Sequence, residues 1–303
     1  MIALVCPGQG SQKPGFLSQW LELEGVRDHL EQLSAAADLD LVHYGTEADE
    51  ETIKDTAIAQ PLIVAAGLVT GRLALTALKG QDLILAGHSV GEISACTLAG
   101  VLTDEEAMRF IKVRATGMAA ASAATPTGMA AVLGGAEADV RAAIEAAGLT
   151  AANSNGGGQI VAAGSLDNIA TFAQNPPAKA RVIPLRVAGA FHTSYMASAQ
   201  EPLADFAATL SPAQPQFELL SNYDGQALAG GQETLDSLVA QVTRPVRWDL
   251  CMQTLGNHQV SRIVEVSPAG TLIGLAKRAM RGTPSTAVNT PADLEELTEA
   301  LSA

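Results

Sequence analysis

Cysteine is scarce in this sequence, and the few cysteines present form no pattern typical of a disulfide framework or a metal site. The 303 residues contain three of them, Cys6, Cys96 and Cys251, with no CxxC spacing. An odd, scattered set of thiols indicates neither paired disulfides nor zinc binding. We therefore expect reduced thiols in the core of a cytoplasmic protein, and we predict no metal and no cofactor.

Lysine and arginine are also few. There are 18 of them against 32 aspartates and glutamates, which gives a formal net charge of −14 at pH 7. A chain this acidic is poorly suited to binding the phosphates of nucleic acid, so we predict no nucleic-acid partner. Binding to any anionic partner would need a local basic patch.

Long uninterrupted apolar runs are missing as well. The first residues, MIALVCPGQG, have no basic segment and their apolar run ends at Pro7, so we do not expect a signal peptide. The most hydrophobic stretch, residues 61–78, contains Arg72. It predicts a buried helix that begins at Pro61 rather than a membrane span. With 48% hydrophobic and 17% charged residues, the composition is typical of a globular protein with a sizeable core.

Short apolar runs and helical patterns alternate along most of the chain, as in the strands predicted at 2–6 and 83–86. This alternation indicates a parallel sheet covered on both faces. Between 125 and 188 small residues dominate and the predicted order becomes βαββαβ, which is typical of a ferredoxin-like unit. We therefore predict an α/β fold. Its large, α/β-hydrolase-like subdomain comprises 1–124 and 189–303, and a ferredoxin-like small subdomain, 125–188, is inserted in it.

The stretch LILAGHSVGE, residues 83–92, combines a buried strand with the pattern G-x-S-x-G. In such an elbow the turn from strand to helix is so sharp that side chains in place of Gly87 and Gly91 would clash with neighbouring elements. Ser89 would then stand exposed at the carboxyl end of the sheet, where the following helix N-terminus stabilises an oxyanion. An ordinary strand–helix turn is the alternative.

A serine nucleophile needs a base, and the chain has five histidines. Three of them, His29, His43 and His258, lie in acidic or polar segments typical of the surface. The ring of His88 is expected to point away from the serine hydroxyl, as a structural residue or a pocket wall. We favour His192 because it follows the inserted unit, where a cleft edge is expected, although spacing alone does not decide this.

Five segments carry a family resemblance: PGQGSQ (7–12), GHSVGE (87–92), VRATGM (113–118), AFHTSYM (190–196) and RPVRW (244–248). In their order and similar spacing, the whole chain resembles the malonyl-CoA:acyl carrier protein transacylase family, in particular its bacterial, stand-alone members of fatty acid synthesis. The resemblance implies transfer of malonyl from malonyl-CoA to the phosphopantetheine thiol of acyl carrier protein, in a ping-pong reaction through a malonyl-serine. Malonyl-CoA and acyl carrier protein are the expected partners, and we expect a monomer that binds no membrane.

The resemblance also implies catalytic roles. Ser89 corresponds to the nucleophile and His192 to the base. The backbone N–H groups of Gln9 and Val90 would form the oxyanion hole. The family orients its histidine with a backbone carbonyl in place of an aspartate, and we assign that carbonyl to Arg247, where many members have glutamine. A main-chain role survives such a change of side chain.

Substrate-binding residues follow from the same resemblance. Arg114 would grip the malonyl carboxylate through two parallel hydrogen bonds, although a lone arginine on a helix is more often a surface residue. Phe191 would fill the space that a methyl on the alpha carbon needs. His88, Asn153 and Asn155 would border the acyl-CoA groove.

A basic cluster is the candidate docking surface for the carrier protein, which the resemblance implies is itself acidic. No acid occurs between Glu265 and Asp293, yet Lys277, Arg278 and Arg281 lie within five positions. On one helix, Lys277 and Arg281 would share a face. These cations would equally complement the negative end of their helix. The opposite wall of the docking site would carry Lys179, Arg181 and Arg186.

Three other functions stay open. A serine esterase or thioesterase would need an aspartate or glutamate partner for its histidine and has no use for Arg114. The malonyl-loading subunit of a malonate decarboxylase shares the motifs. A catalytically inactive binding module would be expected to lose Ser89, His192 or Arg114, and the chain has all three.

Overall fold

The computed structural model describes residues 1–302, and its larger sheet is parallel throughout. The central strand β1 pairs in parallel with β2 on one edge and with β8 on the other. The strands, in spatial order, are β7 (Glu218–Leu219), β2 (Leu83–Gly87), β1 (Ile2–Cys6), β8 (Arg262–Glu265) and β9 (Ser285–Ala287).

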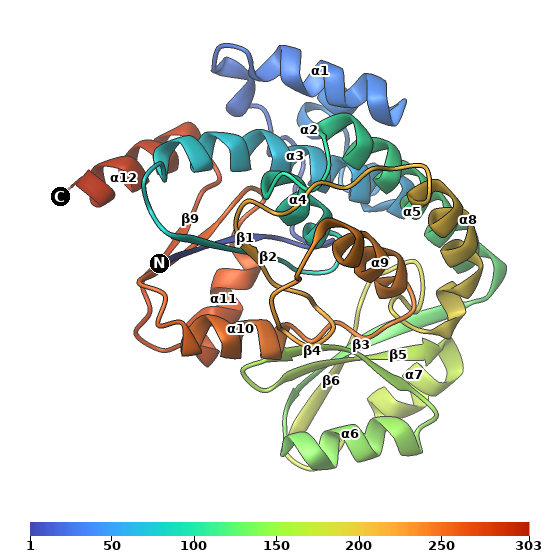
Figure 1. Ribbon diagram of the computed structural model, residues 1–303. Coiled ribbons are helices and arrows are strands. Elements are labelled where there is room, and N and C mark those ends of the chain that lie inside the picture. The colour runs from blue at the N-terminus through green and yellow to red at the C-terminus, as the bar shows by residue number, and fades with distance from the viewer. Residues whose placement is uncertain (303) are drawn as a thin grey trace.

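Helices cover both faces of this sheet, and its strands are therefore buried on both sides. In β1, Leu4 and Cys6 face one apolar cluster and Ala3 and Val5 face another. Figure 1 shows the corresponding helices on opposite sides of β1 and β2. The first cluster includes residues of α3 (Thr56–Ala77), α4 (Gly91–Leu98) and α5 (Asp104–Ala124), and the second those of α10 (Trp248–Asn257) and α11 (Thr271–Ala279).

A separate four-stranded antiparallel sheet lies below the first in Figure 1. Its spatial order, β4-β5-β3-β6, is that of a ferredoxin-like unit, so the predicted fold class is confirmed. The division of the chain at 124/125 and 188/189 stays a prediction. The elements, in chain order, are β3 (Thr127–Gly134), α6 (Glu137–Ala146), β4 (Thr150–Gly156), β5 (Gln159–Ser165), α7 (Leu166–Gln174) and β6 (Ala180–Pro184).

Backbone hydrogen bonds join the antiparallel sheet to the rest of the molecule. The N–H of Val246 donates to the carbonyl of Ala152 at 2.8 Å, and the N–H of Ser154 donates to the carbonyl of Val246 at 2.8 Å. Asn153 and Val246 thereby form a parallel bridge. Because β4 carries asparagines expected in the substrate groove, this bridge fixes one wall of the groove against the segment that precedes α10.

Helix α3 begins five residues earlier than predicted. Asp55 caps it by accepting a hydrogen bond from the N–H of Ala57 at 2.8 Å, so Pro61 lies inside the helix and not at its start. Within residues 1–302, α3 is the one helix long and apolar enough to cross a membrane. However, 78% of its most apolar window is buried inside the fold, so packing in the core accounts for its hydrophobicity.

The remaining elements complete the outer layers. Strand β9 and helix α12 were not expected from the sequence, because the segment after Gly282 shows only a short, polar pattern. The elements of the outer layers not yet described are η1 (Trp20–Glu22), α1 (Val26–Ala37), α2 (Leu41–Thr46), η2 (Thr52–Lys54), η3 (Ser194–Ala199), α8 (Gln200–Ala207), α9 (Gly231–Gln241) and α12 (Pro291–Ser302).

Candidate active site

A sharp elbow carries Ser89 between β2 and α4. Ser89 has a φ of 54°, in the left-handed region that non-glycine residues rarely adopt. A Cβ on Gly87 would lie 2.0 Å from the backbone carbon of Gly91, and a Cβ on Gly91 would lie 2.3 Å from the carbonyl oxygen of Cys6. Both flanking positions must therefore be glycine for the turn to close.

His192 lies directly against the serine. The Ser89 Oγ and the His192 Nε2 are 2.7 Å apart, and the His192 Nδ1 is 3.0 Å from the backbone carbonyl oxygen of Gln241. A carbonyl only accepts, so Nδ1 carries the hydrogen and Nε2 keeps the lone pair that faces the hydroxyl. The arrangement presents the tautomer that a general base requires.

The surroundings of His192 keep its ring neutral. Burial, together with the positive charge of Arg114, lowers the pKa of His192 to about 3. At neutral pH the ring is therefore uncharged and ready to accept a proton from Ser89.

The residue that orients His192 differs from the predicted one. The carbonyl belongs to Gln241, so the assignment to Arg247 was wrong. Arg247 instead lies directly before α10. Its guanidinium pairs with Asp249 at 2.8 Å, and its backbone N–H donates to the backbone carbonyl of Asn222 at 2.7 Å. A main-chain acceptor leaves no side-chain signature, and this explains why the sequence did not separate the two positions.

The predicted oxyanion hole has suitable geometry. Within residues 1–302, neither the N–H of Gln9 nor that of Val90 donates to a protein acceptor. Gln9 lines the pocket next to Ser89, and Val90 stands at the N-terminus of α4. Free N–H groups at a helix start favour a developing negative charge. Their role stays a prediction.

A pocket of about 360 Å³ opens above the elbow, between the two sheets. The Nε2 of His88 lies 2.9 Å from the Oδ1 of Asn155, which links the elbow to β4. This volume exceeds that of an acyl group and suits a longer ligand arm. The predicted residues that line the pocket together are His88, Ser89, Asn153, Asn155, Phe191 and His192.

Arg114 is buried behind this pocket, with 1% of its surface exposed. Its Nη1 donates to the Oε1 of Gln60 at 2.6 Å and its Nη2 donates to the Oε1 of Gln241 at 2.8 Å. Gln60 itself lines the pocket, so it connects the guanidinium to the substrate space. Burial lowers the pKa of Arg114 to about 10, opposed by Glu92, and the group stays protonated at neutral pH.

Three buried residues next to the elbow were missed by the sequence analysis. Glu92, Asn222 and Gln241 are 4%, 1% and 5% exposed. Asn222 and Gln241 hydrogen-bond the backbone of Ser89, and Glu92 contacts both of them. Only Glu92 gave a signal in the sequence, as an acid in the first turn of an otherwise apolar helix.

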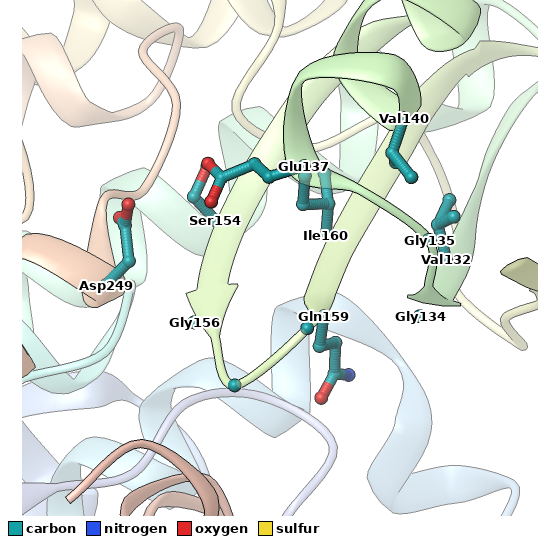
Figure 2. Close-up of a pocket in the computed structure, with 12 residues that line it drawn as sticks. Val132, Gly134, Gly135, Glu137, Val140, Ser154, Gly156, Gln159, Ile160 and Asp249 are labelled. Carbon is teal, nitrogen blue, oxygen red and sulfur yellow. The ribbon is translucent and has the colours of Figure 1, made fainter. Parts of the chain in front are cut away.

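A second hollow, of about 70 Å³, lies away from the serine, between the small sheet and α10. Figure 2 shows Asp249 of α10 facing Glu137 and Ser154 across it. Neither Ser89 nor His192 lines it, and residues 1–302 hold no cluster of three acidic, histidine or cysteine ligands for a metal. The chemistry therefore belongs to the pocket above the elbow.

The predicted docking cations are exposed, but they do not share a helix face. Helix α11 ends at Ala279, so Arg281 lies beyond it and its predicted one-turn pairing with Lys277 was wrong. The Nη2 of Arg278 donates to the Oε1 of Gln159 at 3.1 Å. This contact places Arg278 against the hairpin of β4 and β5, at the edge of the pocket.

The three cations predicted on the opposite wall separate into two groups. Arg186 lines the pocket across from Leu272 and Leu275 of α11. Lys179 and Arg181, at the start of β6, do not line it. Of this set, Arg186 is therefore the one placed to meet a ligand entering the pocket.

Fold and site together define an α/β enzyme in which a serine on a strand–helix elbow contacts a histidine that a main-chain carbonyl orients. The model of the acyl transferase domain family matches residues 3–293. The malonyl CoA-acyl carrier protein transacylase of Mycobacterium tuberculosis is 52% identical over 299 residues, 98% of this chain and 99% of that protein. The Escherichia coli K12 protein of that name is 30% identical and covers 96% of each chain. The chain belongs to the malonyl CoA-acyl carrier protein transacylase family.

Solved structures agree with this assignment. The crystal structure of the transacylase from Mycobacterium tuberculosis superposes with a TM-score of 0.95 at 53% identity, over 98% of this chain and 99% of that one. A malonyl-transacylase solved in complex with a type II polyketide acyl-carrier protein gives a TM-score of 0.91 at 27% identity, over 99% of each chain.

Proposed function

We propose that this protein transfers malonyl from malonyl-CoA to the phosphopantetheine thiol of acyl carrier protein through a malonyl ester on Ser89. The observation that carries the proposal is the 2.7 Å contact between the Ser89 hydroxyl and a neutral His192, in a pocket backed by the buried Arg114. The names of the relatives support the same donor and acceptor.

The geometry supports each step of a ping-pong reaction. Ser89 Oγ attacks the thioester carbonyl while its proton moves to the Nε2 of His192. The N–H groups of Gln9 and Val90 receive the developing oxyanion, and the carbonyl of Gln241 stabilises the charged imidazole ring. His192 then returns the proton to the departing CoA sulfur. The thiol of the carrier protein repeats the sequence in reverse.

A transferase must keep its acyl-enzyme until a thiol arrives. The partner of His192 Nδ1 is a carbonyl and not a carboxylate, which an esterase or thioesterase would use. A carbonyl stabilises the charged ring less than a carboxylate would, so activation of water is weaker. This observation favours transfer over hydrolysis.

Arg114 supplies the selectivity for malonyl in this proposal. The substrate carboxylate would replace the Oε1 of Gln60 as partner of the guanidinium, while Gln241 keeps the other nitrogen in place. A buried fork of donors matches a carboxylate in two parallel bonds. Acetyl has no such charge to offer.

The experiment that tests the function follows the malonyl group by intact mass. The protein is incubated with malonyl-CoA, freed of excess nucleotide, and mixed with holo acyl carrier protein. We expect a malonyl adduct on the enzyme that moves to the carrier protein. An adduct lost to water alone would indicate a hydrolase, and transfer only to a decarboxylase carrier subunit would indicate the malonate decarboxylase alternative.

Phe191 is expected to exclude a methyl group on the alpha carbon, because its buried ring lines the pocket beside the base. We predict that Phe191→Ser raises kcat/KM for methylmalonyl-CoA relative to malonyl-CoA by roughly tenfold or more, since a pocket rejects one methyl group by about 1–3 kcal/mol. Phe191→Leu should give a smaller rise. Equal rates with both thioesters in the native protein would contradict this role.

Lys277 and Arg278 are expected to attract the carrier protein, because two anionic proteins associate only where a local positive patch outweighs their repulsion. We predict that Lys277→Glu with Arg278→Glu raises the apparent KM for acyl carrier protein, more so at low salt, where screening is weak. Acylation of Ser89 by malonyl-CoA should change little. Transfer rates are measured against carrier concentration at two ionic strengths.

A matched control separates docking from net charge. Arg27→Glu with Lys79→Glu changes the charge equally at two exposed cations outside the pocket. This pair should leave the KM for the carrier nearly unchanged. If both double variants raise the KM for the carrier equally, or if neither raises it, Lys277 and Arg278 do not dock the carrier. They would then only complement the negative C-terminal end of α11.

We also propose that the protein works in the cytoplasm as a monomer. Its three cysteines are free and buried, which is compatible with a reducing compartment.

A further inference from the structure

The backbone of Ser89 is held on both sides by buried amides. Its N–H donates to the Oδ1 of Asn222 at 2.7 Å, and its carbonyl accepts from the Nε2 of Gln241 at 3.0 Å. Residues with positive φ stay in place only where their surroundings fix them. These two amides therefore hold the nucleophile in its strained conformation.

Glu92 connects the two amide residues. One carboxyl oxygen, Oε1, accepts from the backbone N–H of Asn222 at 2.5 Å, and the other, Oε2, accepts from the side-chain amide of Gln241. Asn222 also donates to the carbonyl of Gly87 at 2.7 Å. One buried acid thus orders the contacts on both sides of the elbow.

The contacts fit the ionised form of Glu92. Burial raises the pKa of this carboxyl to about 8, although its two hydrogen bonds and the charge of Arg114 offset part of that rise. Both oxygens face N–H donors, and a proton on either oxygen would have no acceptor there. This arrangement of donors therefore favours the carboxylate over the acid. No ion pair within 4 Å joins Glu92 to Arg114 in residues 1–302, so the carboxylate acts on the amides.

We propose that Glu92 is a positioning residue that holds the strained backbone of Ser89 through Asn222 and Gln241. The inference rests on the proposed role of Ser89 as the nucleophile. Loss of one acceptor would let one amide turn and displace the hydroxyl from His192. A displacement of about 1 Å at a reacting group costs on the order of 10²-fold in rate.

The test compares acylation by malonyl-CoA and by acetyl-CoA in Glu92→Gln. Glutamine has a similar shape but offers one acceptor, and its amide N–H₂ would oppose a donor. We expect both acylation rates at saturating thioester to fall by the same factor, roughly 10- to 100-fold, with the malonyl over acetyl preference unchanged. Glu92→Asp keeps the charge but is one carbon shorter, and it should also lower the malonyl and acetyl acylation rates by one common factor. This variant decides the question if Glu92→Gln does not fold.

Asp104→Asn is the control for lost stability. Asp104 pairs with His29 and Arg72 at the start of α5, outside the pocket, so this variant should lower the Tm and leave both acylation rates unchanged. Native rates in both folded Glu92 variants would overturn the proposal. A loss confined to malonyl-CoA would also overturn it, because Glu92 would then act on Arg114. If the native protein itself forms no adduct, the proposed function fails first.

Discussion

Ser89→Ala will carry no malonyl adduct after incubation with malonyl-CoA. His192→Ala will form the adduct several orders of magnitude more slowly than the native protein. The serine hydroxyl is the atom that becomes esterified, so its removal leaves nothing to acylate. Without His192 the proton of that hydroxyl has no acceptor at 2.7 Å. Removing one member of such a pair costs on the order of 10⁴- to 10⁶-fold. Intact mass against time measures both variants.

Ser94→Ala is the matched control, because Ser94 lies one turn further along α4. Its hydroxyl is buried and has no hydrogen-bond partner within the described chain. This variant should form the adduct at the native rate. An adduct that persists in Ser89→Ala would end the mechanism, since another nucleophile would then carry the malonyl group.

Arg114→Ala will lose its preference for malonyl-CoA. The acylation rate with malonyl-CoA should fall on the order of 10²- to 10³-fold, because a buried carboxylate loses its charged partner. Acylation by acetyl-CoA should fall less or rise, since acetyl does not use the guanidinium. Acylation rates with the two thioesters, measured separately and expressed as a ratio, give the result.

Two further variants sharpen this test. Arg114→Lys keeps a positive charge but not the planar fork, so it should recover part of the preference. Arg109→Ala removes an exposed arginine of the same helix that pairs with Glu105, and it should leave the ratio unchanged. If Arg114→Ala keeps the native ratio, another group selects the carboxylate.

Local sequence patterns predicted most of the fold and the reacting pair. The strand before Ser89, the glycines beside it and the helix after it are neighbours in the chain, so their geometry is encoded locally. The position of His192 after the inserted unit made it a candidate, and the family resemblance was needed to choose it among the five histidines. The ferredoxin-like order was readable because each of its turns carries glycine or proline.

Features that depend on contacts distant in sequence were not predicted. Gln241 and Asn222 reach Ser89 across more than 130 residues, and neither position differs locally from an ordinary polar residue. The choice between Gln241 and Arg247 depends on a main-chain carbonyl, which any residue supplies. Arg281 was placed on α11 because the helical pattern continues to Gly282, whereas the helix itself ends at Ala279.

The position of β1 at the centre of the parallel sheet has a consequence for synthesis of the chain. Its pairing partners are β2, about 80 residues later, and β8, about 260 residues later. Proteins are made from the N-terminus, so β1 leaves the ribosome before β2 and long before β8. One of its edges then stays without a partner until 262–265 have been made. An unpaired apolar strand readily pairs with other chains, and the nascent protein must keep this edge covered until β8 has been made.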